Sequence, residues 1–395
     1  MISAASRPYI DASVPVLREH GAQITRTFYR NVFAELPALT NLFNMGNQAN
    51  GAQQQSLASA VFAYAANIGN PGALGPVVGR IVHKHVSVGI REEHYPIVGR
   101  HLLGAIAETL GDAATPELLA AWDEAYNALA RIFIDAERAL YAGAGIAPGQ
   151  TRSMRVTEIV RESDDVLSLR LAPVDGGPLP AHKAGQYVSV TVTFADGHRQ
   201  IRQYSLSDAA RPDSLRISVK REAGGAHAQG EVSNWLHANL NEGSVLEVSP
   251  PWGDFLPDTE SNEPVVLLSA GIGITPMIAA LKRIAQHNPQ RYVLFGHAAR
   301  SPALHAHRSD LAAAQKAMPN LQVATFYEED ASAPALAGRM DVASLPHWPR
   351  SETNVYLCGP LGFMQAQWKA LLGAGVPPAR LHREVFGPEL LDHLL

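Results

Sequence analysis

Residues 80–97, RIVHKHVSVGIREEHYPI, place a histidine where it can bind a metal ion. His85 lies on the apolar face of a helical pattern that includes Ile81 and Val86. A neutral imidazole can bind a metal ion through one ring nitrogen while the other donates a hydrogen bond. Tyr95 follows after a short polar break, near enough in sequence to orient that ring. On these residues alone, a core histidine without a metal is the more frequent outcome.

Two other histidines, His83 and His101, compete for the same role. His83 is two residues from His85 and must point in a different direction on a helix, so the two cannot bind one metal ion together. The sixteen histidines of the chain are scattered, and no set of them combines zinc-site spacing with partner ligands.

Residues with hydrogen-bond donors and apolar side chains precede this segment. Tyr29 has a hydroxyl donor and Gln53 an amide donor. Leu57 lies one helical turn from Gln53 on the same face, and Phe43 opens a loop. These side chains can line a ligand pocket, although the two aromatic residues by themselves are more typical of an ordinary core.

Glu137 lies near the end of the last helical pattern before a break rich in glycine and alanine. If its carboxylate accepts a hydrogen bond from the far nitrogen of His85, the imidazole becomes a stronger electron donor to a metal. The alternative, which the residues alone favour, is an exposed carboxylate paired with Arg131 or Arg138.

Two segments have the side chains that a flavin nucleotide requires. The segment Arg202-Gln203-Tyr204-Ser205 resembles the Arg-x-Tyr-Ser signature of ferredoxin-reductase-type flavoproteins. That resemblance implies an arginine fork on the pyrophosphate, a tyrosine ring on the flavin and a serine hydroxyl near the redox nitrogen. Glu231-Val232-Ser233 opens a helix whose free amide groups suit a phosphate, and Tyr187 is a second flavin contact. The alternative is plain strand alternation followed by an ordinary capped helix.

Two further segments suit a nicotinamide dinucleotide. The first, Gly271-Ile272-Gly273-Ile274-Thr275-Pro276, follows an apolar strand and opens a helix, where glycines let the backbone approach a pyrophosphate. Pro276 replaces the third glycine of the Rossmann pattern, which agrees with the reductase type. The second, Cys358-Gly359-Pro360, also follows a strand, and in that type the turn lies beside the transferred hydride. The alternative for the cysteine is a buried small hydrophobe.

The composition describes an ordinary globular chain. Its 395 residues suggest about two to three domains. The formal charge of −5 gives no electrostatic case for nucleic acid or an anionic membrane. One cysteine excludes an internal disulfide and favours the cytoplasm. We find no signal peptide, and glycines and a proline interrupt the most membrane-like window, 264–281, so we expect no membrane span.

Hydrophobic periodicity changes twice along the chain. A first helix, with Ser13 as its cap and Pro15 in its first turn, and later helices predict an all-α domain over 1–140. A small, flexible segment, 141–150, predicts a linker. Short strands then predict an antiparallel β-barrel over 151–262. From 263 to 395, strands alternate with helices, which predicts an α/β domain with a parallel sheet.

The helical third also matches a known family at several segments. These are Phe28-Tyr29, Asn41-Leu42-Phe43-Asn44-Met45, Gln53, Leu57, Lys84-His85, Glu93-His94-Tyr95-Pro96-Ile97-Val98-Gly99 and His101-Leu102-Leu103. With the flavin and nicotinamide motifs in order behind them, the chain resembles flavohaemoglobins, the bacterial and fungal nitric oxide dioxygenase family. The resemblance covers essentially the whole chain and implies a globin domain, an FAD-binding barrel and an NAD(P)-binding domain of ferredoxin-reductase type.

The resemblance also implies roles for the residues of the helical third. His85 would bind haem b, and Tyr95 and Glu137 would complete a proximal triad with it. Tyr29 and Gln53 would donate hydrogen bonds to a diatomic ligand on the other side. Phe28, Phe43, Leu57 and Lys84 would belong to the haem pocket. A lipid in the distal haem pocket and a monomeric state are further expectations.

The tail Glu384-Val385-Phe386-Gly387-Pro388 resembles the segment of the family that contacts the flavin. Phe386 would cover the flavin ring until nicotinamide displaces it, and Glu384 with Lys84 would lie between the two redox centres. The alternative is a terminal aromatic residue that packs on its own domain.

The implied activity is a relay in which NAD(P)H reduces FAD, FAD reduces haem, and haem with O₂ oxidises nitric oxide to nitrate. Two alternatives stay open. One is an NAD(P)H-dependent haem-flavin oxidase or a hydroperoxide or lipid reductase; the other is a sensor of O₂ or nitric oxide kept ferrous by its reductase. The sequence leaves NADH and NADPH undecided, because Arg300 suits a 2′-phosphate but is equally typical of an exposed arginine.

Overall fold

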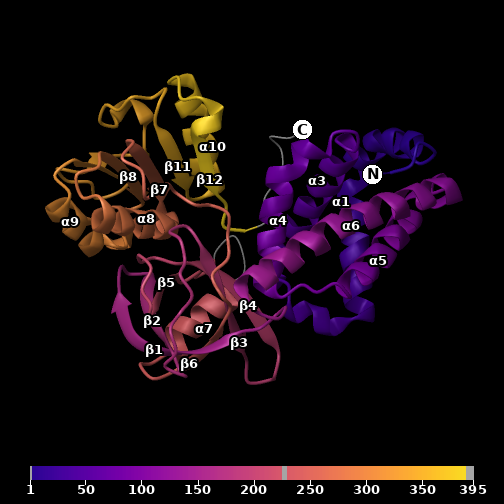
Figure 1. The fold of residues 1–395 in the computed structure, drawn as a ribbon, viewed down its shortest axis with the longest axis horizontal. Coiled ribbons are helices and arrows are strands. Elements are labelled where there is room, and N and C mark those ends of the chain that lie inside the picture. The colour runs from indigo at the N-terminus through magenta and orange to yellow at the C-terminus, as the bar shows by residue number, and fades with distance from the viewer. Residues whose placement is uncertain (1, 225–228, 388–395) are drawn as a thin grey trace. The chain divides into compact units, whose positions relative to one another are not determined.

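The computed structural model describes residues 2–224 and 229–387 (Figure 1). The chain divides into two compact units. The first contains the described residues up to Thr151 together with 191–202 and Gly387, and the second contains the described residues of 152–190 and 203–386.

Helices make up most of the first unit. They are α1 (Arg7–Glu35), α2 (Met45–Ala49), α3 (Ala52–Ala66), α4 (Gly75–Val88), α5 (His94–Leu110) and α6 (Pro116–Ala144). Short 3₁₀ turns lie at Pro37–Asn41, Pro71–Leu74 and Gly111–Ala113. The apolar core lies between α1, α3, α5 and α6, where its largest members include Phe28, Phe62, Ile106 and Trp122. The predicted all-α globin domain is confirmed.

The first helix differs from the prediction. Ser13 does not cap α1, because the helix begins at Arg7 and Pro15 lies inside it. The Ser13 hydroxyl instead donates to the carbonyl of Ile10 at 2.7 Å. A proline inside a helix removes one backbone hydrogen bond, and the buried face of α1, which packs against α3 and α5, outweighs that loss.

The ends of α4 and α6 follow from their sequences. Gly89 ends α4 with a positive φ of 80°, a conformation that glycine adopts without steric cost. The backbone N–H of Ile90 then donates to the carbonyl of His85 at 3.0 Å, so His85 lies in the last, well-closed turn of α4. Thr115 caps α6 by accepting a hydrogen bond from the Leu118 N–H at 3.3 Å. The positions of His85 and Glu137 are thus set by two helices with defined ends.

The barrel strands form a six-stranded sheet in the order β4-β3-β6-β1-β2-β5. The strands are β1 (Arg152–Arg161), β2 (Val166–Pro173), β3 (Tyr187–Thr193), β4 (Arg199–Ser205), β5 (Leu215–Lys220) and β6 (Val245–Val248), with α7 (Glu231–Asn239) before β6. β1 pairs antiparallel with β2 and β6, and β2 with β5. The expected antiparallel FAD-binding fold is confirmed.

The last part of the chain forms a second six-stranded sheet in the order β10-β9-β8-β7-β11-β12. Its strands are β7 (Val265–Ala270), β8 (Val293–Ala299), β9 (Leu321–Tyr327), β10 (Leu336–Ala337), β11 (Asn354–Cys358) and β12 (Leu381–Glu384). All described pairs are parallel. The helices are α8 (Ile274–His287), α9 (Arg308–Ala317) and α10 (Leu361–Gly373).

Side-chain alternation explains why both faces of this sheet are apolar. Val265 and Leu267 of β7 pack with α8 and α9, while Val266 and Leu268 pack on the opposite face with Leu371 of α10. A parallel sheet covered by helices on both faces needs such continuous apolar strands. The predicted α/β domain is confirmed. Within the described residues, every helix is too short or too polar to cross a lipid bilayer.

Candidate functional site

A hydrogen-bonded triad forms where α4, α5 and α6 meet. The Nδ1 atom of His85 lies 2.7 Å from Oε1 of Glu137 and 3.1 Å from the hydroxyl oxygen of Tyr95. The ring of Phe133 packs edge-on against the imidazole, with 5.7 Å between ring centroids. These contacts fix the orientation of the ring and engage only one of its nitrogens. The opposite nitrogen, Nε2, has no polar partner among the described residues and can bind a metal.

Glu137 is buried, with 3% of its surface exposed. The alternative that it is an exposed carboxylate paired with Arg131 or Arg138 is therefore wrong. Arg138 instead pairs with Glu92 and Asp135, at 2.9 and 3.3 Å. Because Glu137 accepts from the imidazole, the imidazole is oriented by an anion in a water-poor environment, where such hydrogen bonds are strong.

Tyr95 acts as a donor in this triad. Burial raises the pKa of its phenol, and the hydrogen bond to the Glu137 carboxylate raises it further. The phenol therefore stays protonated and donates to Oε1 of Glu137 at 2.5 Å. The hydroxyl of Tyr126 in turn donates to the backbone carbonyl of Tyr95 at 2.6 Å, which holds the start of α5 in place.

The competing histidines have different surroundings. His101 is 8% exposed, and its Nε2 lies 3.4 Å from a carboxylate oxygen of Glu35. His83 is half-buried on α4, two residues before His85. His85 has its Nδ1 bound by the buried carboxylate of Glu137, which is the arrangement that suits an axial imidazole of haem iron.

Tyr29 is the centre of a second cluster, on α1. Its side chain is 5% exposed, and its ring lies 5.6 Å from Phe43 and 4.9 Å from Phe28 between centroids. Burial raises the pKa of the Tyr29 phenol to about 12, and side-chain hydrogen bonds with Gln53 and Gln48 partly oppose that shift. The phenol is therefore a protonated donor at any physiological pH.

Gln48 was not predicted from the sequence. It lies in the short helix α2, is 9% exposed, and its Oε1 accepts from Gln54 Nε2 at 2.8 Å. Nothing in its sequence environment distinguishes it from other polar residues of the loop between α1 and α3. Leu57 and Phe43 are half-buried and pack against the same apolar cluster as Tyr29, together with Ile81 of α4. Lys84 is exposed on α4.

The predicted flavin residues lie on β4 and the segments that pack beside it. Arg202, Gln203, Tyr204 and Ser205 are consecutive on β4, so Arg202 and Tyr204 point to the same face. Tyr187 starts β3 and exchanges two backbone hydrogen bonds of 2.8 Å with Trp252.

Glycines near Tyr187 keep the backbone closely packed. A Cβ atom on Gly185 would lie 2.0 Å from the carbonyl oxygen of Phe255, and one on Gly253 would lie 3.1 Å from the Tyr187 ring. Both glycines have positive φ, of 94° and 121°. Only glycine combines a positive φ with such close contacts, so these two glycines let the backbone pack tightly around Tyr187.

The predicted phosphate loop begins α7. Ser233 accepts from the Glu222 N–H and donates to the carbonyl of Gly230, each at 3.1 Å, which fixes the first turn. The amide groups of Glu231, Val232 and Ser233 belong to this turn, where no carbonyl of the helix accepts from them. Val232 and Ser233 are buried and Glu231 is exposed, so the turn offers an anion its backbone while its side chains anchor the helix.

The structure brings the two nicotinamide segments together. A Cβ atom on Gly273 would lie 2.3 Å from the carbonyl oxygen of Cys358 and 2.7 Å from the amide nitrogen of Gly359. Gly271 has a φ of 53°, which allows the turn from β7 into α8. The segment Gly271–Gly273 is a 3₁₀ turn that leads directly into α8. This close backbone approach at the carboxyl ends of β7 and β11 is the geometry that a dinucleotide requires.

The side chains of these segments are mostly buried. Ile274 and Thr275 are 0% and 2% exposed, and Ile272 is half-buried. Pro276 is the third residue of α8, where the missing N–H removes no helix bond. Cys358 is fully buried, burial raises the pKa of its thiol, and Pro360 is exposed. The buried thiol agrees with the alternative of a small core residue, so this turn would face a dinucleotide with its backbone and not with the thiol.

The described part of the C-terminal segment continues β12. Glu384 pairs with Cys358 in the parallel ladder, and Val385 follows it, half-buried. Phe386 is 45% exposed, so its ring is not packed into the core of its own domain. Gly387 is the last described residue, and Pro388 lies outside the described residues. The placement of Glu384 and Lys84 between two redox centres stays a prediction.

Comparison with known proteins identifies the family to which the chain is related. Residues 26–133 match the globin family and residues 267–369 the oxidoreductase NAD-binding domain. The flavohemoprotein of Bordetella parapertussis is 48% identical over 403 residues, covering 98% of this chain and 99% of its own. The chain belongs to the flavohemoprotein family. The family's redox chemistry makes it an oxidoreductase that uses haem, FAD and NAD(P)H, with a globin domain that suits O₂.

Solved structures of related proteins agree with this family assignment. The flavohemoglobin of Malassezia yamatoensis, crystallised with bound FAD and heme, is 32% identical with a TM-score of 0.86 and covers 98% of this chain and 100% of its own. The FAD/NAD-binding domain of nitric oxide dioxygenase from Vibrio cholerae is 39% identical with a TM-score of 0.57, covering 60% of this chain and 99% of its own. The expected family and cofactors are thereby confirmed.

Proposed function

We propose that this chain is an NAD(P)H-dependent nitric oxide dioxygenase. The relative from Vibrio cholerae carries that activity in its name. The observation that supports the proposal most directly is the buried triad of His85, Tyr95 and Glu137, because an imidazole bonded to a carboxylate gives electron density to iron. Such a ligand favours O₂ activation over reversible O₂ storage.

When bound, the cofactors would supply the redox chemistry, which is hydride donation by NAD(P)H, single-electron transfer through FAD and oxidation of nitric oxide with O₂ at haem iron. The balanced reaction converts two nitric oxide, two O₂ and one NAD(P)H into two nitrate, one NAD(P)⁺ and one proton. No other substrate is required, which agrees with the apolar cluster that contains Tyr29 and against which Phe43 and Leu57 pack.

The protein's own groups have separate tasks in this proposal. His85 would bind the haem iron, and Glu137 and Tyr95 orient the His85 ring. Tyr29, with Gln53, directs a hydrogen-bond donor at a bound diatomic molecule, while its apolar neighbours exclude water that would release reactive oxygen species. Arg202 and the first turn of α7 bind the flavin phosphates, and Gly271–Gly273 with Gly359 admit the dinucleotide backbone.

An electrode assay tests the proposal. Purified holoprotein with NADH and air should remove nitric oxide and form nitrate, with two nitrate for each NADH. Tyr29→Phe should slow that removal, whereas Tyr64→Phe should not, because the Tyr64 hydroxyl donates to the backbone of Ala125. Peroxide without nitrate would indicate a haem-flavin oxidase, and slow removal with a stable ligand complex would indicate a sensor; either result overturns the proposal.

A cytoplasmic location is part of the proposal. The single cysteine, Cys358, is free and buried, which agrees with a reducing compartment. A lipid in the distal pocket and a monomeric state stay predictions.

A further inference from the structure

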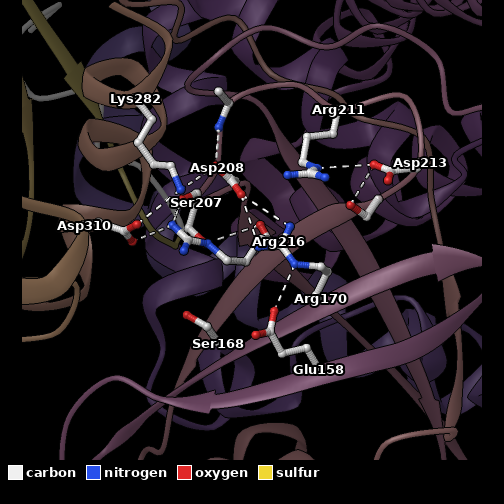
Figure 2. Close-up of polar contacts among 12 residues, drawn as sticks. Glu158, Ser168, Arg170, Ser207, Asp208, Arg211, Asp213, Arg216, Lys282 and Asp310 are labelled. Atoms are coloured by element: carbon white, nitrogen blue, oxygen red, sulfur yellow. Dashed lines mark hydrogen bonds and ion pairs between the residues drawn. The ribbon is translucent and has the colours of Figure 1, made fainter. Parts of the chain in front are cut away.

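A buried ionic cluster joins the barrel to the NAD(P)-binding domain (Figure 2). We call Asp208, Arg216, Lys282 and Asp310 the junction cluster. Lys282 Nζ lies 2.7 Å from Asp208 and 3.1 Å from Asp310, and an Arg216 nitrogen lies 2.8 Å from Asp310. Asp208 and Arg216 come from the barrel, whereas Lys282 and Asp310 come from α8 and α9. The cluster therefore crosses between the two domains of one compact unit.

The members of the cluster are shielded from water. The side chains of Asp208, Arg216 and Asp310 are 9%, 10% and 15% exposed, and that of Lys282 is 27% exposed. Two carboxylates face two cations, and Arg170 adds a further contact to Asp208 at 3.3 Å while also bonding Glu158. Buried ion pairs contribute little net stability compared with apolar packing, but they fix one relative arrangement of the groups that they join.

Further hydrogen bonds next to the cluster also connect the barrel to the NAD(P)-binding domain. His307 precedes α9 with a positive φ of 61°. Its Nδ1 lies 2.9 Å from Asp310, and its Nε2 lies 3.0 Å from the Ser218 hydroxyl on β5. The backbone N–H of Asp164 also donates to the carbonyl of Ala303 at 3.1 Å. Bonds from several elements therefore hold the barrel and the NAD(P)-binding domain in one relative orientation.

The side chains next to the cluster do not suit a divalent metal ion. Ligand atoms of Glu162, His307 and Asp310 lie within 4.8 Å of one another. Asp310 already pairs with Arg216 and Lys282, so a divalent cation would meet two positive charges beside its ligand.

The cluster is placed where it can control hydride transfer. Asp208 follows Ser205, the end of the flavin segment of β4, by three residues. We call Gly271–Gly273, which leads into α8, the nicotinamide loop. Lys282 lies eight residues after Ile274, the first residue of α8, which is about 12 Å along a rigid helix. The ion pair between Lys282 and Asp208 thus joins the residues that follow the flavin segment to the helix that begins at the nicotinamide loop.

We propose that the junction cluster sets the position of the nicotinamide loop relative to the flavin strand, and that Lys282 and Asp208 are positioning residues for hydride transfer. Neither residue touches the reacting atoms. The inference rests on the FAD and NAD(P) sites and is independent of what the haem does with the electrons. Hydride transfer depends steeply on donor–acceptor distance, so a shift of about 1 Å can reduce its rate roughly 100-fold.

The test uses the full-length holoprotein with Lys282→Met. We expect flavin reduction by NADH, followed anaerobically and expressed per bound flavin, to slow by about 10- to 100-fold. The kinetic isotope effect with C4-deuterated NADH should increase, because hydride transfer then limits the rate completely. The charge-transfer absorbance between reduced nicotinamide and flavin should weaken, a readout that does not depend on turnover.

Two variants control this test. Arg283→Met removes the next cation of α8, which pairs at 2.8 Å with the more exposed Glu260 and is outside the junction cluster. It should leave the isotope effect and the charge-transfer absorbance unchanged. Lys282→Arg keeps the charge and should restore most of the rate.

If Lys282→Met does not fold, the pair Lys282→Met with Asp208→Asn removes one charge of each sign and leaves less charge unpaired. This double variant should fold, bind FAD and still transfer hydride slowly. The proposal is overturned if a folded, flavin-loaded Lys282→Met protein, or the double variant, matches Arg283→Met in rate, isotope effect and charge-transfer absorbance.

Discussion

Replacing Glu137 with glutamine should raise the midpoint potential of the haem. The substitution keeps the shape of the side chain and removes its charge. In the present structure, the carboxylate accepts from His85 Nδ1 at 2.7 Å and from Tyr95 at 2.5 Å, with 3% of Glu137 exposed. A buried anion next to the imidazole stabilises ferric iron more than ferrous iron, because the ferric state carries the greater positive charge.

The magnitude follows from the hydrogen bond to His85. A bond to a charged group contributes about 1.5–3 kcal/mol and a neutral one about 0.5–1.5 kcal/mol, so neutralising the carboxylate weakens the bond by about 1–1.5 kcal/mol. That loss falls mainly on the ferric state. Since 59 mV corresponds to about 1.4 kcal/mol for one electron, we expect the potential to rise by about 40–65 mV.

The assay is a spectroelectrochemical titration of the haem in both proteins. Glu92→Gln is the matched control, because Glu92 is exposed and pairs with Arg138 on the surface. It should not change the potential. A resonance Raman spectrum of the ferrous protein should also show a lower iron–imidazole stretching frequency for Glu137→Gln. An unchanged or lower potential in Glu137→Gln, with haem still bound, would refute the role that we assign to this carboxylate.

Three other predictions address separate parts of the chain. Tyr29→Phe should increase the O₂ dissociation rate by about 10- to 100-fold, the factor given by losing about 1.5–3 kcal/mol of hydrogen bonding; an unchanged rate in flash photolysis would exclude the donor role. Gly273→Ala should abolish NADH-dependent flavin reduction while haem and FAD stay bound, because its Cβ would lie 2.3 Å from the Cys358 carbonyl oxygen, whereas Gly362→Ala, with no atom within 4 Å, should have no effect. Burial alone would raise the pKa of Asp310, but the hydrogen bond from His307 and the charges of Arg216 and Lys282 hold it well below its ordinary value. The stabilisation is present above about pH 4 and is lost as pH falls toward the folded-state pKa. Asp310→Asn should therefore lower the unfolding free energy at neutral pH and make it decrease less as the solution is acidified. Urea unfolding at several pH values measures this, and an equal decrease with acidification in both proteins would contradict the prediction.

Periodicity predicted the elements of this fold well. The apolar run of β7 and the glycine loop before α8 are local features, and the predicted strand and helix lie where the structure has them. The start of α1 was predicted wrongly because Ser13 and Pro15 are typical of a helix start. The packing of a long helix outweighs the local preference of serine and proline for a helix start, because the buried face of α1 includes Ile10 and Leu17 on either side of Pro15.

Long-range partners were harder to predict than elements. Glu137 is 52 residues from His85 in the sequence, and its own surroundings favour surface arginines, so only the family resemblance indicated the triad. The junction cluster gave no signal at all, since Arg216 and Asp310 are 94 residues apart and each is an unremarkable charged residue in its own segment. Gln48 was missed for the same reason. Chemical pairing across helices and domains depends on tertiary packing, which periodicity does not encode.

Anaerobic reduction by NADH tests the central claim most directly, because that claim is an electron relay that ends at an iron held by His85. When the holoprotein is mixed with NADH without O₂, the flavin absorbance should fall first and the haem should then change from the ferric to the ferrous spectrum. His85→Ala should lose the haem and still show the flavin phase. A haem that stays ferric beside a fully reduced flavin, or a normal haem spectrum in His85→Ala, would contradict the account.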